Sequence, residues 1–146
     1  MAGENGHHYE LSGLAVPESL DLVQDLLGRV RGEHSDIDET DLSMFETAIA
    51  EIHGNVVKHG RPPGQVVYAF SLTVRPDRLV GFLADTGEPA PDLSALPIVD
   101  ELAESGRGMW LARATLDELE YARSGDRNTW KMVRFRGEAT SAARRS

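Results

Sequence analysis

The chain has 146 residues and a mass of 16.0 kDa, the size of one average domain. It contains no cysteine, which excludes disulfides, thiolate metal sites and cysteine nucleophiles and favours a reducing cytoplasm. With 24 acidic and 15 basic residues, the net charge is −9, so we expect no direct binding to the phosphate backbone of a nucleic acid. No apolar run approaches the roughly 20 residues that cross a bilayer, so we expect a cytoplasmic chain with no membrane partner.

A strand and a helix are predicted for the N-terminal part. Residues 9–16 alternate loosely between polar and apolar side chains, as an edge strand does. Pro17 then stands where helices often begin, because its missing N–H has no partner to lose in the first turn. The helix that follows ends at Gly32, and its apolar stripe consists of Leu20, Val23, Leu27 and Val30.

A second, longer helix follows, with Ser35 or Asp36 as its predicted N-cap. Its apolar residues advance in steps of three and four: Leu42, Phe45, Ile49, Ile52 and Val56. We predict that it ends with Gly60 in the left-handed conformation, with Pro62-Pro63 preventing its continuation.

The pattern then changes to the alternation of strands. Residues 66–74 and 79–84 alternate with a period of two and are separated by Pro76-Asp77, which predicts an antiparallel hairpin. The stretch from Glu88 to Pro97 contains several prolines and breaks this regularity.

A third helix and a second hairpin are predicted for the remaining residues. Gly106-Arg107-Gly108 opens the helix, and its inward side chains are expected to be Met109, Ala112, Leu116 and Leu119. Residues 121–124 and 129–136 are the predicted closing hairpin, joined by residues 125–128.

The predicted order β-α-α-β-β-α-β-β indicates an α+β fold, a two-layer sandwich. We expect a mixed, mostly antiparallel sheet with the helices on one face. Residues 9–136 form the predicted domain, and residues 1–8 and 137–146, which lack periodic apolar positions, are the predicted tails.

The long helix carries the first candidate site. Glu51, Asn55 and His59 are spaced four residues apart and form a polar stripe. Gly54 lies among them in the helix interior, at a cost of about 1 kcal/mol relative to alanine, which suggests that something packs closely against the backbone. A carboxylate and a carboxamide one turn apart can serve as general base and metal ligand; a solvated helix face is the alternative.

Three more places depart from the local pattern. Asp85-Thr86-Gly87 ends an apolar strand, and Gly106-Arg107-Gly108 runs into a helix, where backbone amides and an arginine can hold an anion. Thr129 brings a hydroxyl into the last strand. Each place also has a simpler explanation. Asp85-Thr86-Gly87 can be an ordinary Asp-x-Gly turn, a single Gly-x-Gly is weak evidence for an anion site, and threonine is common in strands.

The order of these motifs resembles that of the histidine-kinase-like ATPase superfamily, also called GHKL or Bergerat-fold ATPases. Within it, E-I-H-G-N-V-V-K-H-G and S-G-R-G-M-W-L-A-R-A-T-L-D-E-L-E-Y are similar to segments of the bacterial anti-sigma-factor serine kinases. The resemblance extends from Val16 to Arg136.

The resemblance implies a bound ATP and Mg²⁺. Glu51 matches the general base that takes the proton from the attacking hydroxyl, and Asn55 matches the asparagine that holds Mg²⁺. Gly106 and Gly108 match the glycines that contact the phosphates, with Arg107 nearby. Phosphoryl transfer depends mainly on positioning and charge neutralisation, and Mg²⁺ prefers oxygen ligands, so these residue types suit these roles.

The resemblance also implies a site for the adenine base. Asp85 matches the carboxylate that accepts a hydrogen bond from the adenine amino group, Gly87 the glycine below the ring, and Thr129 the threonine beside the pocket. The chain departs from the family pattern at Glu88-Pro89, where a second glycine usually follows.

By this resemblance, the chain is expected to be an anti-sigma factor with serine/threonine-protein kinase activity. It is expected to sequester a sigma factor, to phosphorylate a serine on an anti-anti-sigma antagonist, and to form a homodimer. The alternative is a non-catalytic binding module of the same fold that has lost ATP binding. The catalytic domain of a two-component histidine kinase is disfavoured, because no helical hairpin carrying a phosphoacceptor histidine precedes Val16.

Overall fold

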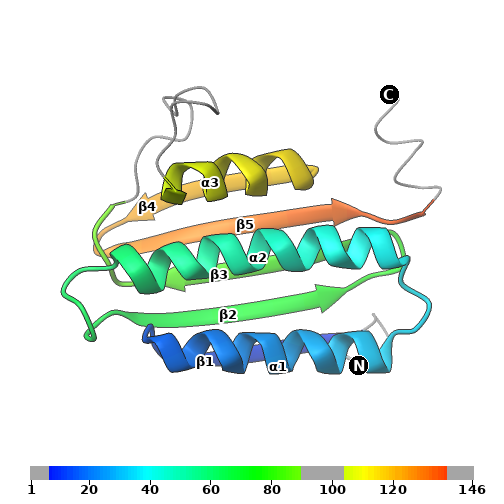
Figure 1. Ribbon diagram of the computed structural model, residues 1–146, viewed down its shortest axis with the longest axis horizontal. Helices are drawn as coiled ribbons and strands as arrows, with labels where there is room; N and C mark the ends of the chain where they lie inside the picture. Colours follow the sequence, from blue (N-terminus) through cyan, green and yellow to red (C-terminus); the bar gives the residue numbers. More distant parts are fainter. Residues whose placement is uncertain (1–6, 90–103, 138–146) are drawn as a thin grey trace.

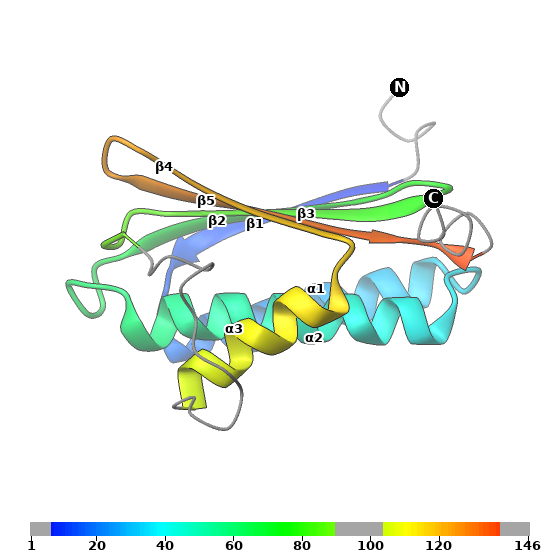
Figure 2. The same cartoon turned by 90° about the horizontal axis from the view of Figure 1, so that it is seen from above.

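The protein is an open sheet covered on one face by helices. Its computed structural model describes residues 7–89 and 104–137, with residues 104–109 described by their backbone alone. The sheet has five strands in the order β1-β2-β3-β5-β4. The helices α1, α2 and α3 lie side by side on the same side of the sheet (Figures 1 and 2).

The elements follow the predicted order. The strands are β1 (His7–Leu14), β2 (Val67–Val74), β3 (Arg78–Asp85), β4 (Glu118–Ser124) and β5 (Arg127–Phe135). The helices are α1 (Pro17–Glu33), α2 (Glu39–His59) and α3 (Glu104–Thr115). All pairings between these described strands are antiparallel. The predicted α+β class with helices on one face is therefore confirmed, and no parallel pair occurs among the described strands.

Strand β1 begins two residues before the predicted domain boundary. His7 and His8 pair with Val74 and Thr73, and Nδ1 of His8 lies 2.8 Å from Oγ1 of Thr73. The prediction that residues 1–8 form a tail is therefore wrong for these two histidines. Ladder pairing with β2 orders them although their own sequence has no apolar alternation.

The boundaries of α2 differ from the prediction at both ends. Its N-cap is Asp38 instead of Ser35 or Asp36, and the Asp38 carboxylate accepts a hydrogen bond from the Asp41 N–H at 3.2 Å. Gly60 follows the helix in an extended conformation, with φ −63° and ψ 138°, so the predicted left-handed cap is wrong. Glycine is needed there for space instead, because a Cβ at Gly60 would lie 2.5 Å from the Val56 carbonyl oxygen.

The third helix is shorter at its C-terminal end than predicted. It ends at Thr115, so Leu116 and Leu119 are not helical, and Leu119 pairs with Met132 on the sheet. The Asp117 N–H donates to the Val133 carbonyl at 2.8 Å and so directs the chain into β4. Leu116 and Leu119 still pack against the core, as their predicted inward position requires.

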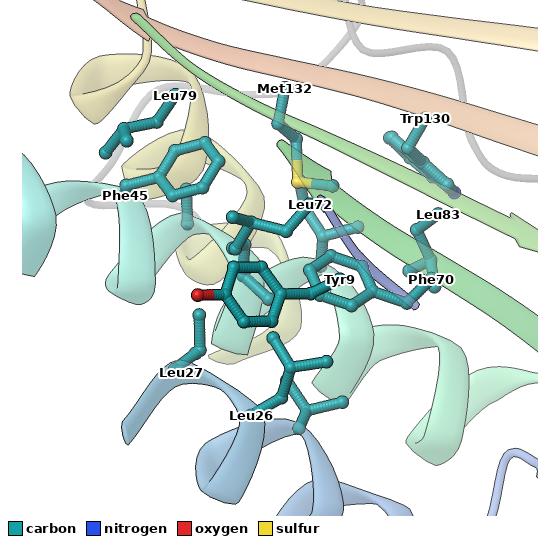
Figure 3. Packing of buried hydrophobic residues seen from close by; sticks show 14 of the residues in the cluster. Tyr9, Leu26, Leu27, Phe45, Phe70, Leu72, Leu79, Leu83, Trp130 and Met132 are labelled. Carbon is teal, nitrogen blue, oxygen red and sulfur yellow. The ribbon is translucent and has the colours of Figure 1, made fainter. Parts of the chain in front are cut away.

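The core lies between the sheet and the helices. Alternate residues of the strands point towards the helices and are buried, while α2 contributes Phe45, Ile49 and Ile52. Figure 3 shows a close view of this cluster, with labelled side chains at Tyr9, Leu26, Leu27, Phe45, Phe70, Leu72, Leu79, Leu83, Trp130 and Met132. No helix in the described ranges has the length and apolar character needed to cross a membrane.

Candidate functional site

The sequence-predicted motifs meet at one end of the molecule. Strand β3 ends there with Asp85, α2 ends there with His59, and β5 begins there with Arg127 (Figure 1). Helix α3, which begins at Glu104, packs against α2 and runs in the opposite direction. Four elements that are distant in sequence thus bring their ends to the same place.

Glu51 and Asn55 lie one turn apart on α2. Both side chains are half-buried, and neither forms a hydrogen bond within the part of the chain that the structure describes. An added Cβ at Gly54 would meet no described atom within 4 Å. The close packing that Gly54 suggested is therefore not supplied by a described protein group.

Asp85 is a buried carboxylate, 4% exposed, at the end of β3. Its Oδ1 accepts hydrogen bonds from the Gly87 N–H at 2.8 Å and from Nδ2 of Asn128 at 2.9 Å. A Cβ at Gly87 would lie 3.0 Å from that Oδ1 and 3.6 Å from the Cα of Gly60. The Asp-x-Gly turn is therefore tightly packed against the chain that leaves α2, and its carboxylate has a fixed position.

Asn128 holds this turn from the opposite strand, and sequence reasoning missed it. It pairs with Asp85 across β3 and β5 and is only 2% exposed. Its Nδ2 donates to the carbonyls of Gly87, at 3.2 Å, and Glu88, at 2.9 Å, as well as to Asp85. Its Oδ1 accepts from the Tyr121 hydroxyl and from Nη1 of Arg123. The available signal was an amide residue within an otherwise alternating strand.

Thr129 does not lie beside Asp85. It pairs with Ala84 and Ala122, and because side chains alternate along a strand, it lies on the face opposite to that of Asp85 and Asn128. The expected position of Thr129 in the same pocket as Asp85 is therefore wrong. The predicted loop 125–128 is only the two-residue turn Gly125-Asp126, which places residue 128 on the inner face.

Gly106 and Gly108 lie in the first turns of α3, as predicted for a helix opening, although the helix begins two residues earlier at Glu104. This places their backbone at the same end of the molecule as Asp85 (Figure 1). The side chain of Arg107 lies outside the described set, so its expected phosphate contact stays a prediction, as do the contacts of the two glycines.

A buried histidine lies on α2 between Glu51 and Asn55. Nε2 of His53 is 2.9 Å from Oγ of Ser19, whose hydroxyl donates to the Val16 carbonyl at 2.7 Å. His53 is 1% exposed, and burial lowers its pKa to about 4, although the nearby Asp85 carboxylate acts to raise it. His53 is therefore neutral at physiological pH. His59, by contrast, is exposed.

Two further polar atoms near Asp85 lack partners among the described residues. These are Nδ1 of His53 and the hydroxyl of Tyr68, and both side chains are buried. Tyr68 pairs with Asp85 across β2 and β3, and its ring centroid lies 4.7 Å from that of His53. Buried polar groups without a partner are uncommon and often mark sites that water or a ligand completes.

The chemistry of this end fits a purine nucleotide and a hard cation. The fixed Asp85 carboxylate can accept a hydrogen bond from an amino group, and the amide oxygen of Asn55 is a donor type that Mg²⁺ prefers. The Glu51 carboxylate, without a described partner, can accept a proton.

Residues 14–134 match the family described as the histidine kinase-like ATPase domain. The chain belongs to this family. Its members bind ATP, usually with Mg²⁺. A comparison with curated proteins finds no match.

Solved structures of similar fold include the following two. The RsbU and RsbW domains of Rv1364c from Mycobacterium tuberculosis have a TM-score of 0.62 and 18% identity, over 90% of this chain and 33% of that one. The histidine kinase domain of the blue-light activated histidine kinase EL346 from Erythrobacter litoralis has a TM-score of 0.51 and 16% identity, over 76% of this chain and 59% of that one. The chain thus spans less than two thirds of either structure, and both likenesses concern the fold.

Proposed function

We propose that the chain is an anti-sigma factor with serine-protein kinase activity that uses Mg-ATP. Family membership supports the nucleotide, and the sequence resemblance to anti-sigma serine kinases supports the substrate class. The similar fold of a protein with an RsbW domain agrees with this proposal. The single observation that carries it is the position of Glu51 and Asn55 on α2, without described partners, at the end of the molecule where Asp85 is fixed.

In this proposal each residue has one task. The Asp85 carboxylate accepts a hydrogen bond from the adenine amino group, and Gly87 leaves room for the base. Asn55 holds the cation, and Glu51 accepts the proton of the attacking serine hydroxyl. When bound, ATP would supply the γ-phosphoryl group to the serine oxygen and leave as ADP, and Mg²⁺ would offset the negative charge of the phosphates. Phosphorylation of the antagonist then decides which protein partner the chain holds.

Kinase activity is tested with Glu51→Gln, which keeps the shape of the side chain but removes the base. We expect phosphate transfer to a candidate antagonist to fall by about 10²-fold or more, the usual contribution of general base catalysis, while ATP affinity stays unchanged. Asn55→Ala should weaken Mg-dependent ATP binding. Glu18→Gln, at an exposed position on α1, is the matched control and should retain both properties. The kinase is refuted if wild type transfers no phosphate from ATP to the antagonist. Equal transfer by wild type and Glu51→Gln refutes the role of Glu51 as the base.

The second candidate is a binding module of the same fold that has lost ATP. It is favoured by the turn after Asp85, where Glu88-Pro89 follow Gly87 and Asn128 binds the carbonyls of both Gly87 and Glu88. Calorimetric titration with ATP and Mg²⁺ distinguishes the two candidates. Absence of binding up to millimolar ATP supports the module, and saturable binding supports the kinase.

The proposed partners are a sigma factor, an anti-anti-sigma protein and a second copy of this chain in the cytoplasm. The face of the sheet opposite to the helices exposes the apolar side chains of Val67 and Phe82. A hollow of about 660 Å³ lies on this face beside Phe82, lined also by Ser12, Ala69 and Ala84. Exposed apolar surface of this kind suits a protein partner. Analytical ultracentrifugation of the purified chain tests the homodimer.

A further inference from the structure

The hydrogen bonds of Asn128 fix the orientation of its side-chain amide. Its amide nitrogen faces three acceptors, which are the Asp85 carboxylate and the carbonyls of Gly87 and Glu88. Its amide oxygen faces two donors, the hydroxyl of Tyr121 and Nη1 of Arg123. These partners fix which side of the amide is nitrogen, because the reverse orientation would place oxygen against oxygen at all three acceptors.

The consequence for Asp85 is an asymmetric carboxylate. Both described donors, the Gly87 N–H at 2.8 Å and Nδ2 of Asn128 at 2.9 Å, bind Oδ1. No donor within the described residues binds Oδ2. Because Oδ1 accepts two hydrogen bonds, the carboxylate cannot rotate freely. Oδ2 therefore has a fixed orientation and can accept a hydrogen bond from a ligand.

Arg123 extends this arrangement to the edge strand β4. Its Nη1 lies 2.6 Å from the Gly87 carbonyl oxygen and 3.1 Å from Oδ1 of Asn128. A cationic donor on the amide oxygen polarises the amide and strengthens the hydrogen bond from its nitrogen. Hydrogen bonds thus connect Arg123 at the sheet edge, through Asn128, to Asp85 in the turn.

We propose that Asn128 is a positioning residue for base recognition, which occupies Oδ1 of Asp85 and so reserves Oδ2 for a 6-amino group of a purine. The inference rests on the nucleotide site proposed above and assigns base selectivity to a residue outside the motifs that predicted the site. Asn128 itself contacts the turn, and its effect on the base passes through Asp85.

The test compares ATP with purine riboside 5′-triphosphate, which differs from ATP by lacking the 6-amino group. Wild type should bind ATP about tenfold more tightly than this probe, the effect of one hydrogen bond to a charged acceptor. Asn128→Asp replaces the donor by an acceptor that repels Asp85. This variant should lose about tenfold in ATP affinity, while its affinity for the probe changes less than about twofold.

Two further variants separate positioning from folding. Thr129→Val changes the neighbouring residue on the opposite face of β5 and should leave the ratio of the two affinities at the wild-type value. Arg123→Gln, at an exposed position, removes the charge and should reduce the ratio of ATP affinity to probe affinity by about threefold. This variant carries the test if Asn128→Asp is too unstable to measure.

The outcomes are distinct for the two proposals. Wild type that binds neither nucleotide refutes the proposed function and this inference with it. Wild type that binds ATP and the probe equally leaves the kinase in place and overturns the inference. An equal loss of both affinities in Asn128→Asp shows a role in the stability of the turn alone, which also overturns it. A loss confined to ATP supports it.

Discussion

A side chain at Gly87 would lie 3.0 Å from Oδ1 of Asp85, the oxygen that also accepts the Gly87 N–H. The two residues thus form a turn in which the backbone of one passes directly under the carboxylate of the other. The carboxylate cannot move away easily, because Asn128 holds the same oxygen from β5. Gly87 does not have a positive φ, so the backbone conformation alone does not require glycine there. Glycine is required because a side chain would come too close to the Asp85 carboxylate.

Gly87→Ala should therefore disturb Asp85 more than it disturbs the fold. We expect ATP affinity to fall about tenfold and the free energy of unfolding to fall by about 1–2 kcal/mol, a typical cost of forcing an extra methyl group into packed surroundings. Calorimetric titration and urea unfolding measure the two effects. The control is Gly13→Ala on β1, where the nearest described atom is 3.9 Å from the new Cβ. Unchanged ATP affinity in Gly87→Ala contradicts the proposed position of the base.

Gly54→Ala separates the demands of the helix from those of a ligand. Alanine at an interior helix position should stabilise the protein by about 0.5–1 kcal/mol, because no described atom lies within 4 Å of its Cβ. If nucleotide phosphates pack on this surface, Mg-ATP affinity should at the same time fall about fivefold, which corresponds to about 1 kcal/mol.

The matched control for this pair of effects is Gly28→Ala on α1, another helical glycine with no described atom within 4 Å. It should stabilise the protein by a similar amount and leave Mg-ATP affinity unchanged. Stabilisation without loss of affinity at Gly54 places the phosphates elsewhere.

Local patterns were sufficient to predict the order and type of all the described elements. Helical spacing on α2 and alternation on β2 and β3 each depend on side chains that face the same core, so short segments contain the information. Hydrogen-bonded boundaries were predicted less well. The N-cap of α2 is Asp38 instead of Ser35 or Asp36, and a segment with several residues suited to capping does not show which of them the helix uses.

The site was predicted in part, for a related reason. Asp85 and Gly87 are close in sequence and form one turn, so a motif describes them. Asn128 is 43 residues from Asp85, and the register of β5 against β3 brings them together. An error of one residue in the predicted turn exchanges the faces of the sheet on which Asn128 and Thr129 lie. A motif search then selects Thr129 as the neighbour of Asp85 instead of Asn128.

His53 predicts a specific dependence of stability on pH. Its pKa is about 4 in the folded protein and about 6.5 when unfolded, so the unfolded chain binds a proton first as the pH falls. The stability from keeping His53 neutral is therefore complete above pH 6.5 and is lost as the pH falls towards 4. The loss should reach about 3 kcal/mol, with a slope of up to about 1.4 kcal/mol per pH unit.

Urea unfolding of His53→Leu between pH 7 and pH 4 measures this contribution, because the part of the slope due to His53 should disappear. Burial also lowers the pKa of His34, so His34 adds a loss of the same sign, and His34→Gln should leave the His53 part in place. A His53→Leu profile parallel to wild type contradicts the assignment.

The buried ion pair of Asp41 and Arg134 should matter more for stability than any exposed pair in the described chain. Nη2 of Arg134 lies 3.0 Å from Oδ1 of Asp41, and its Nη1 donates to the Thr115 carbonyl at 2.8 Å. Both residues are buried, with Arg134 8% and Asp41 5% exposed, so the pair joins the start of α2, the end of α3 and β5. Arg134→Met leaves the Asp41 carboxylate buried without its cation, which should reduce the free energy of unfolding by about 3–5 kcal/mol.

Arg78→Met breaks the exposed pair with Asp77 and should cost less than about 1 kcal/mol in the same urea titration. Similar costs for the two variants indicate that water reaches Asp41 in place of the arginine.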